Sequence, residues 1–298
     1  MSSSEQSGPV TRKYVTEYDL QLSIMIRSVL PAKELYSEDA ESDDPRNLYL
    51  ICKQPKVIIR PDGVESRGVT VDGRDLVLFR GKATQLSTEP SDVEFVVWTE
   101  SDGPLKWASF PPYDNYEIRT NSGAVFKEGN FALLQLEGGR WFDELWGLSV
   151  VYVGQSFGSR GEKDAVERLR KHSTLQRIVT EAKDGEQVWI LTASVFNRQA
   201  MIESDGRVEV LASDDEDDEH IATVSSFIES DTLTDKLTVD IAEACLIAYF
   251  QPAYNQRLKK DFPGSHKMLM QLRELDFRAI GFENKLLVDR SRVNFAEM

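Results

Sequence analysis

Cysteine is scarce in this sequence: the 298 residues hold only two, Cys52 and Cys245, each in an apolar stretch. Two such residues cannot form the network of disulfides that holds small secreted domains together. The pattern indicates two buried, reduced thiols, and we therefore expect a cytoplasmic protein.

Long hydrophobic runs are also lacking. No stretch approaches the roughly 20 apolar residues that a membrane-spanning helix needs. The stretch Met1–Gly8 is polar and rich in serine, without the apolar segment of a signal peptide. We expect no membrane partner, and we expect residues 1–13 to form a disordered tail.

Positive charge is in deficit, because the formal net charge is −15. Nucleic-acid binding depends on neutralising phosphates, so this balance argues against a general polyanion-binding surface. The negative charge is concentrated, with six consecutive acidic residues at Asp214–Glu219. Runs of like charge repel and stay solvated, so residues 203–233 are predicted to be an acidic surface loop.

A helical period is missing from residues 14–124. This region instead holds short β-branched and aromatic runs such as Leu48–Cys52, and an alternating stretch at Tyr18–Ile24. Turn signals such as Asp72-Gly73 separate the runs. The pattern predicts an N-terminal antiparallel β domain.

The second half alternates strand and helix patterns. Strands are expected at Val150–Gly154 and Val188–Phe196, and helices at Lys163–Ala182 and Leu237–Phe250. We predict an α+β protein in which a small α/β domain, residues 125–262, follows the β domain. Its short mixed sheet would be flanked by helices, and residues 263–298 would form a C-terminal extension that includes a helix at His266–Leu275.

Four short motifs follow one another in this second half. They are Tyr152-Val153-Gly154, Arg168 with His172 four residues later, Glu243 followed by Leu246-Ile247, and Pro252-Ala253-Tyr254-Asn255. In this order they resemble the GIY-YIG nuclease superfamily, and the last two are similar to the incision subunit of bacterial excinuclease. The resemblance covers about residues 125–262.

The resemblance implies a metal-dependent endonuclease acting on nucleic acid, with DNA favoured over RNA. In such a protein the N-terminal β domain would set the choice of substrate or bind a protein partner. Glu243 would hold one divalent cation, Mg²⁺ or alternatively Mn²⁺. Arg168 would bind the scissile phosphate, Tyr152 and His172 would orient or deprotonate the attacking water, and Asn255 would fix the site through its amide.

Four further polar residues near these motifs are candidate substrate contacts: Gln155, Gln176, Arg257 and Lys259. Gln176 continues the spacing of Arg168 and His172, so the three would share one face of a helix.

Each candidate also fits an ordinary structural role. Arg168 can pair with Asp164 one turn earlier, His172 can lie on a solvated helix face, and Asn255 can be a turn residue. Glu243 is harder to explain, because a carboxylate surrounded by apolar residues requires a partner or a metal.

One element of the resemblance is missing at the place where it is expected. The superfamily's first strand carries Gly-Ile-Tyr, and its tyrosine helps to position or deprotonate the attacking water. The segments before Val150 that could fill this place, Phe131–Leu136 and Trp141–Phe142, contain no tyrosine. A catalytically impaired protein that binds partners through the same fold is therefore the alternative, and an unrelated α/β protein with a chance motif is a third reading.

Overall fold

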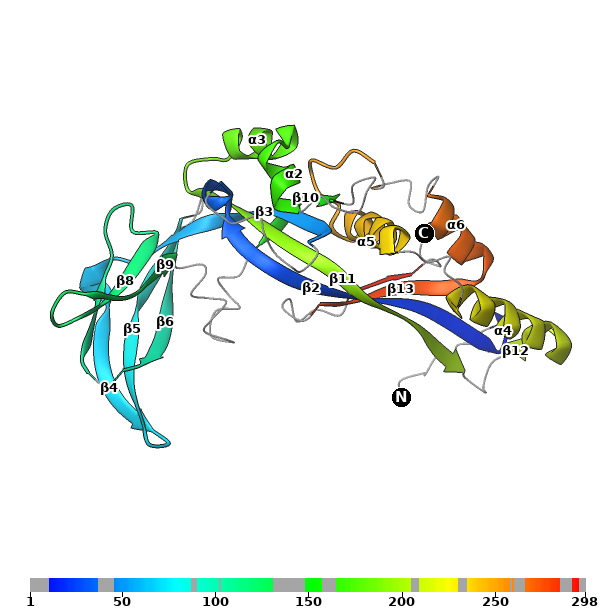
Figure 1. Ribbon diagram of the computed structural model, residues 1–298, viewed down its shortest axis with the longest axis horizontal. Helices are drawn as coiled ribbons and strands as arrows, with labels where there is room; N and C mark the ends of the chain where they lie inside the picture. Colours follow the sequence, from blue (N-terminus) through cyan, green and yellow to red (C-terminus); the bar gives the residue numbers. More distant parts are fainter. Residues whose placement is uncertain are drawn as a thin grey trace, which may run out of the picture.

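The computed structural model describes residues 11–36, 46–86, 90–101, 103–130, 148–156, 165–204, 209–229, 235–257, 259, 266–284 and 291–294. These residues form a mixed α+β structure in which strands predominate, as the sequence predicts. Figure 1 shows two lobes along the long axis: a β lobe made of β4 to β9, and a main lobe in which helices cover a long sheet.

The main sheet has the strand order β14-β13-β2-β11-β3-β10. Within it β13 runs parallel to β2, and the other neighbours are antiparallel. Its strands are β2 (Thr16–Pro31), β3 (Leu48–Ile58), β10 (Ser149–Gln155), β11 (Glu186–Ser204), β13 (Phe277–Asn284) and β14 (Ser291–Asn294). A two-stranded parallel sheet of β1 (Thr11–Arg12) and β12 (Glu209–Val210) lies beside it.

Both faces of the main sheet are covered, and the side-chain alternation of β3 shows how. Leu48, Leu50 and Cys52 belong to the core shared with α4 (Asp214–Glu229), α5 (Asp235–Phe250) and α6 (Lys267–Glu274). Tyr49 and Ile51 point to the other face and join α2 (Ala165–Arg170) and α3 (Ser173–Thr180). Because a strand buried on both faces needs apolar residues at successive positions, the run Leu48–Cys52 suits this central place.

The β lobe continues from the end of β3, where Lys56–Ile58 pair with β5. Its strands are β4 (Glu65–Val71), β5 (Arg74–Leu86), β6 (Ser91–Glu100), β7 (Leu105–Ala108), β8 (Asn115–Thr120) and β9 (Val125–Asn130). Two short 3₁₀ turns, Ala32–Glu34 and Pro61–Gly63, complete the elements. A core of its own fills the lobe, with Phe79, Phe95, Tyr116 and Ile118 fully buried and Trp107 stacked on Tyr116 at 4.9 Å between ring centroids.

The boundary expected at residue 124 does not separate two sheets. Strands β2 and β3, from the predicted N-terminal domain, pair with β11 and β10 from the predicted α/β domain. The N-terminal strands therefore complete the sheet of the second half. Within the described residues the β lobe is an insertion between β3 and β10, because both of these strands lie side by side in the main sheet.

The prediction of a loop over residues 203–233 is corrected, because residues 214–229 form a helix and residues 203–204 and 209–210 belong to strands. Helix α4 begins at Asp214, and Ser213 and Glu216 form a reciprocal cap at its start, with Ser213 N donating to Glu216 Oε2 at 2.9 Å. Carboxylates in the first turn are favourable for the helix dipole, and Val224 and Phe227 bury the opposite face. Charge repulsion is thus outweighed by capping and burial.

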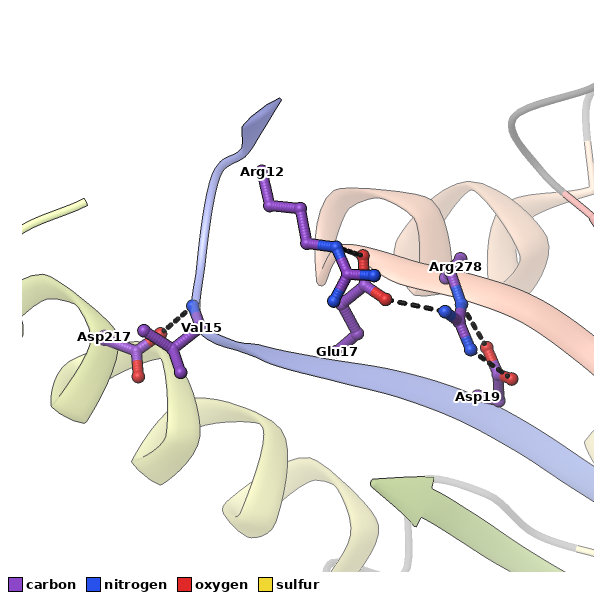
Figure 2. A network of polar contacts seen from close by, with 6 residues as sticks. All are labelled: Arg12, Val15, Glu17, Asp19, Asp217 and Arg278. Carbon is purple, nitrogen blue, oxygen red and sulfur yellow. Dashed lines mark hydrogen bonds and ion pairs between the residues drawn. The ribbon is translucent and has the colours of Figure 1, made fainter. Parts of the chain in front are cut away.

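The two ends of the described chain are tied to the main sheet by a polar network (Figure 2). Arg278 on β13 forms ion pairs with Asp19 (Nη2 to Oδ2, 3.1 Å) and Glu17 (Nη1 to Oε2, 2.7 Å) on β2. Glu17 also pairs with Arg12, whose Nε lies 3.1 Å from Oε1. Residues 11–13 are therefore not part of a disordered tail, and α6 and β13 belong to the main lobe.

Helices in the described ranges are all too short or too polar to cross a bilayer. The two cysteines are buried and unpaired, in agreement with the sequence analysis.

Candidate functional site

The motif Tyr152-Val153-Gly154 lies on β10, whose antiparallel partner is β3. Gly154 lies opposite Tyr49 in this pairing. A Cβ atom at position 154 would approach both Cζ and Oη of Tyr49 to 2.5 Å, so only glycine lets the tyrosine ring lie over this point of the strand. Packing therefore explains the glycine of the motif: the ring that excludes a larger residue belongs to a tyrosine more than a hundred residues earlier in the sequence.

Three aromatic rings meet beside this pair of strands. The ring centroids of Tyr152 and His172 are 5.2 Å apart, and the Tyr49 ring lies 6.1 Å from Tyr152 and 5.8 Å from His172. Tyr49 is fully buried. Burial is the main reason that the pKa of Tyr49 is raised, with smaller contributions from Tyr152 and Glu243.

The tyrosine next to Tyr152 therefore comes from β3 and not from the chain just before Val150. The segments Phe131–Leu136 and Trp141–Phe142, where we expected the first strand, lie outside the described residues. Among the described strands the neighbour of β10 is β3, and this pairing places Tyr49 beside Tyr152.

Arg168 and His172 do not share one continuous helix, contrary to the prediction for Lys163–Ala182. Helix α2 ends at Arg170 and α3 begins at Ser173, with His172 between them as the N-cap of α3. Its Nδ1 accepts a hydrogen bond from Leu175 N at 3.4 Å, which supplies a partner for one of the unpaired N–H groups of the first turn. Because Nδ1 is an acceptor, neutral His172 carries its proton on Nε2.

Glu243 lies on α5, where its small neighbours Ala242 and Ala244 are fully buried. The Gln155 amide at the end of β10 links this helix to the strand: Nε2 donates to Glu243 Oε2 at 2.8 Å and to Asp240 Oδ1 at 2.7 Å. Burial, followed by the nearby charge of Asp240, raises the pKa of Glu243 to about 7, while the Gln155 hydrogen bond and the charge of Arg168 oppose the rise.

Two carboxylates and one amide lie together around Glu243. Gln155 Oε1 is buried without a hydrogen-bond partner in the described structure, and it belongs to the amide that contacts both carboxylates. No group of three or more His, Cys, Asp or Glu side chains suited to a metal occurs among the described residues. One carboxylate with oxygen neighbours fits Mg²⁺, which usually keeps several waters and takes only one or two carboxylates.

Asn255 uses its whole side-chain amide to hold the turn after α5 against β10. Its Oδ1 accepts from Val153 N and its Nδ2 donates to Val153 O, both at 2.9 Å. The next hydrogen bond along the strand joins Tyr254 N to Val151 O at 3.0 Å. The turn therefore extends the edge of β10 as an extra strand would, and fixes α5 relative to Tyr152.

A cleft of about 450 Å³ opens at this junction of β10, α3, α5 and the turn. Figure 1 shows β10 lying between α2 and α3 on one side and α5 on the other. The lining residues are Tyr152, Thr174, Arg177, Glu243, Ile247, Tyr254, Asn255, Gln256 and Arg257. Four predicted site residues thus line one cleft, three of them predicted as catalytic.

The remaining predicted residues lie at different places around the cleft. Arg168 is exposed on α2, and its charge acts on the pKa values of Tyr49, Tyr152, His172 and Glu243. Gln155 donates hydrogen bonds to Glu243 and Asp240. By contrast, Gln176 and Lys259 do not belong to the cleft lining; Gln176 is exposed on α3, and the carbonyl of Lys259 accepts from Gln251.

The site favours uncharged aromatic groups. Burial, followed by the charge of Glu243, raises the pKa of Tyr152. Burial, followed by the charge of Arg168, lowers the pKa of His172. At neutral pH the phenol keeps its proton and the imidazole is neutral, so both act as hydrogen-bonding groups without net charge.

Three residues around the site were not predicted from the sequence as site residues: Tyr49, Asp240 and Arg177. The signal for Tyr49 is that it is the tyrosine within the apolar strand Leu48–Cys52. Treating the whole β lobe as an insertion would have placed this strand beside Tyr152. Asp240 lies one helical turn before Glu243, the spacing that places two carboxylates on one face. No sequence pattern distinguishes Arg177 from other exposed helix arginines.

Comparisons with known protein families, with curated proteins and with solved structures found no match for this chain.

Proposed function

We propose that this protein is a metal-dependent endonuclease that hydrolyses phosphodiester bonds in nucleic acid, with DNA as its favoured substrate. The observation that carries the proposal is the single cleft that gathers Tyr152, Glu243 and Asn255, with His172 packed against Tyr152. These residues come from a strand, a helix cap, a helix and a turn, and the first two lie far from the last two in the sequence. Their convergence favours a shared chemical task over a chance motif.

The arrangement around β10 also supports the resemblance to the GIY-YIG superfamily. Tyr49 on β3 supplies a tyrosine beside Tyr152, in the place of the superfamily's first-strand tyrosine. The antiparallel neighbours β10, β3 and β11 would be the nuclease sheet, with α2 and α3 on one face and α5 on the other. In this proposal the β lobe is inserted between the two tyrosine strands and chooses the substrate or a protein partner.

We assign Arg168, whose charge acts on the titratable groups around the cleft, to the scissile phosphate. A guanidinium binds two phosphate oxygens at once and keeps its charge at every working pH. Its exposure on α2 leaves it free to meet a substrate, while its charge acts on the four titratable groups around the cleft.

Tyr152 and His172 would orient the attacking water and would not deprotonate it. The raised pKa of Tyr152 keeps the phenol protonated, and His172 already uses Nδ1 to accept from Leu175. The group that His172 can present is therefore the Nε2–H, a donor to a phosphate oxygen or to the water. Of the two roles that the resemblance allows for these residues, orienting the water and deprotonating it, this assignment keeps only the first.

Glu243 would hold the divalent cation, supported by Gln155 and Asp240. A bound Mg²⁺ supplies a Lewis acid for the phosphate and lowers the pKa of a coordinated water. Gln155 keeps the carboxylate of Glu243 in place through its Nε2–H, and Asn255 keeps α5 in register with β10.

A binding module without catalysis is the second candidate function. It is favoured by the complete burial of Tyr49, because a hydroxyl with no access to the cleft does not touch the attacking water. In this alternative the cleft and the β lobe bind nucleic acid or a protein partner, and no bond is broken.

Nicking of supercoiled plasmid DNA separates the two functions. We expect the protein to convert supercoiled plasmid to the open circle with Mg²⁺ or Mn²⁺ and not with EDTA. Replacing Arg168 with alanine should slow the reaction about 100-fold or more, the effect of removing one group that stabilises transition-state charge. Absence of metal-dependent cleavage of plasmid DNA and of RNA transcripts would favour the binding module.

A further inference from the structure

A second arginine, Arg177 on α3, lines the cleft and is held by two neighbours. Its guanidinium lies over the ring of Tyr254, 4.9 Å from the ring centroid. Its Nε is 3.9 Å from Oε1 of Glu181, one turn later on the helix. The hydroxyl of Tyr254 donates to the other oxygen of the same carboxylate, so the three side chains form a closed clamp.

The clamp is connected to the strand that carries Tyr152. Tyr254 N donates a hydrogen bond to Val151 O at 3.0 Å. The side-chain amide of the next residue, Asn255, accepts a hydrogen bond from Val153 N and donates one to Val153 O. The position of the Tyr254 ring, and with it the position of the guanidinium, is thus fixed relative to β10.

An arginine that is held in this way has already lost part of its side-chain freedom. A free arginine loses up to about 2 kcal/mol of rotamer entropy when it is ordered. Isolated exposed ion pairs between helix neighbours contribute little to stability, so stability alone does not explain a clamp that also recruits Tyr254 from a distant turn. Preorganisation of a binding group does explain it.

Positive charge also faces the cleft. The chain carries a net charge of −15, yet the cleft lining holds two arginines, Arg177 and Arg257, and one carboxylate, Glu243. Glu181, the ion-pair partner of Arg177, adds a second carboxylate beside this lining. Two guanidinium groups are thus presented to the cleft by a chain that is acidic as a whole.

Resting on the proposed function, we propose that Arg177 binds a backbone phosphate next to the scissile one, and that Tyr254 and Glu181 are its positioning residues. Arg168 would act on the phosphate that reacts, and Arg177 on a neighbour that does not. Arg177 would accordingly contribute to substrate affinity and not to the chemical step.

The test is the salt dependence of binding to a fluorescein-labelled DNA duplex, followed by fluorescence anisotropy with Ca²⁺ in place of Mg²⁺. We expect Arg177→Ala to raise Kd about tenfold, the lower range for a charge-assisted hydrogen bond. It should also reduce the slope of log K against log salt concentration by about 0.9, the value for one phosphate contact on duplex DNA. Arg177→Lys should restore the slope, because it keeps the charge.

Two further variants separate a binding role from a structural one. Arg273→Ala removes an exposed arginine from α6, away from the cleft, and should leave Kd and slope unchanged. Tyr254→Phe keeps the ring and removes the hydrogen bond to Glu181, and should raise Kd about two- to threefold without altering the slope. In multiple-turnover cleavage, Arg177→Ala should raise KM and leave kcat nearly unchanged.

The outcomes for Arg177 and for the nuclease proposal can be told apart. Binding with a salt slope that Arg177→Ala does not change overturns the role of Arg177, whether or not the protein cleaves DNA. Binding with the expected change in slope supports Arg177 even in a protein that does not cleave. A protein that neither binds nor cleaves DNA or RNA overturns both proposals.

Discussion

Replacing Glu243 with glutamine should stabilise this protein at alkaline pH. The carboxyl has an ordinary pKa of 4.5 and a pKa of about 7 in the folded protein, chiefly because it is buried. Between these two values the folded state keeps a proton that the unfolded chain has lost. Raising the pH through this window therefore lowers the free energy of unfolding, and above pH 7 the full penalty remains.

The size of the penalty follows from the pKa difference. At about 1.4 kcal/mol for each pKa unit, the step from 4.5 to about 7 corresponds to at most about 3 kcal/mol. Glutamine has nearly the same shape and no charge, and it can still accept from Gln155. Glu243→Gln should thus be more stable than the wild type by about 3 kcal/mol at pH 8 and by only about 1 kcal/mol at pH 5.5.

The assay is urea unfolding in EDTA at both pH values, followed by circular dichroism. Glu128→Gln, which changes an exposed carboxylate on β9, is the matched control and should shift stability by less than about 0.5 kcal/mol at either pH. Adding Mg²⁺ should stabilise the wild type and not Glu243→Gln. A variant that is less stable than the wild type at pH 8, or a difference that does not change with pH, would refute the reasoning.

Three further substitutions test the packing that builds the site and the fold. Gly154→Ala places a methyl group against the tyrosine ring of β3 and should cost about 1–3 kcal/mol in thermal unfolding, whereas Gly68→Ala, with open space around it, should not destabilise comparably. Asn255→Ala removes two hydrogen bonds to β10 and should cost about 2 kcal/mol in urea unfolding; retained stability would contradict the bracing role. Arg278→Ala leaves two partly buried carboxylates without this partner and should lower the free energy of unfolding by about 2 kcal/mol. Arg74→Ala, in an exposed pair, should lower it by less than about 1 kcal/mol, and equal losses for the two variants would contradict this account.

Local patterns were sufficient for the elements that carry their own signal. The helix at residues 237–250 and the strand at residues 150–154 are confirmed, because apolar periodicity and a following proline act within a few residues. The acidic stretch was predicted wrongly, since six like charges obscured the Ser213–Glu216 cap that starts α4.

Long-range pairing was beyond reach of the same patterns. Nothing local indicates that β3 lies beside β10, because a chain of about ninety residues can be inserted between two paired strands at small entropic cost. Tyr49 was therefore missed, although its strand was recognised. The constraint on Gly154 was equally out of reach, because it is the ring of Tyr49 that packs on it.

The most direct test of the proposed nuclease centre is the plasmid-nicking rate of Glu243→Gln at pH 8 with Mg²⁺, compared with the free energy of unfolding of the same preparation at pH 8 in EDTA. The account predicts that nicking falls at least 100-fold while stability rises, so that unfolding cannot explain the lost activity. A variant that nicks plasmid DNA as fast as the wild type would contradict the assignment of Glu243 and, with it, the proposed centre.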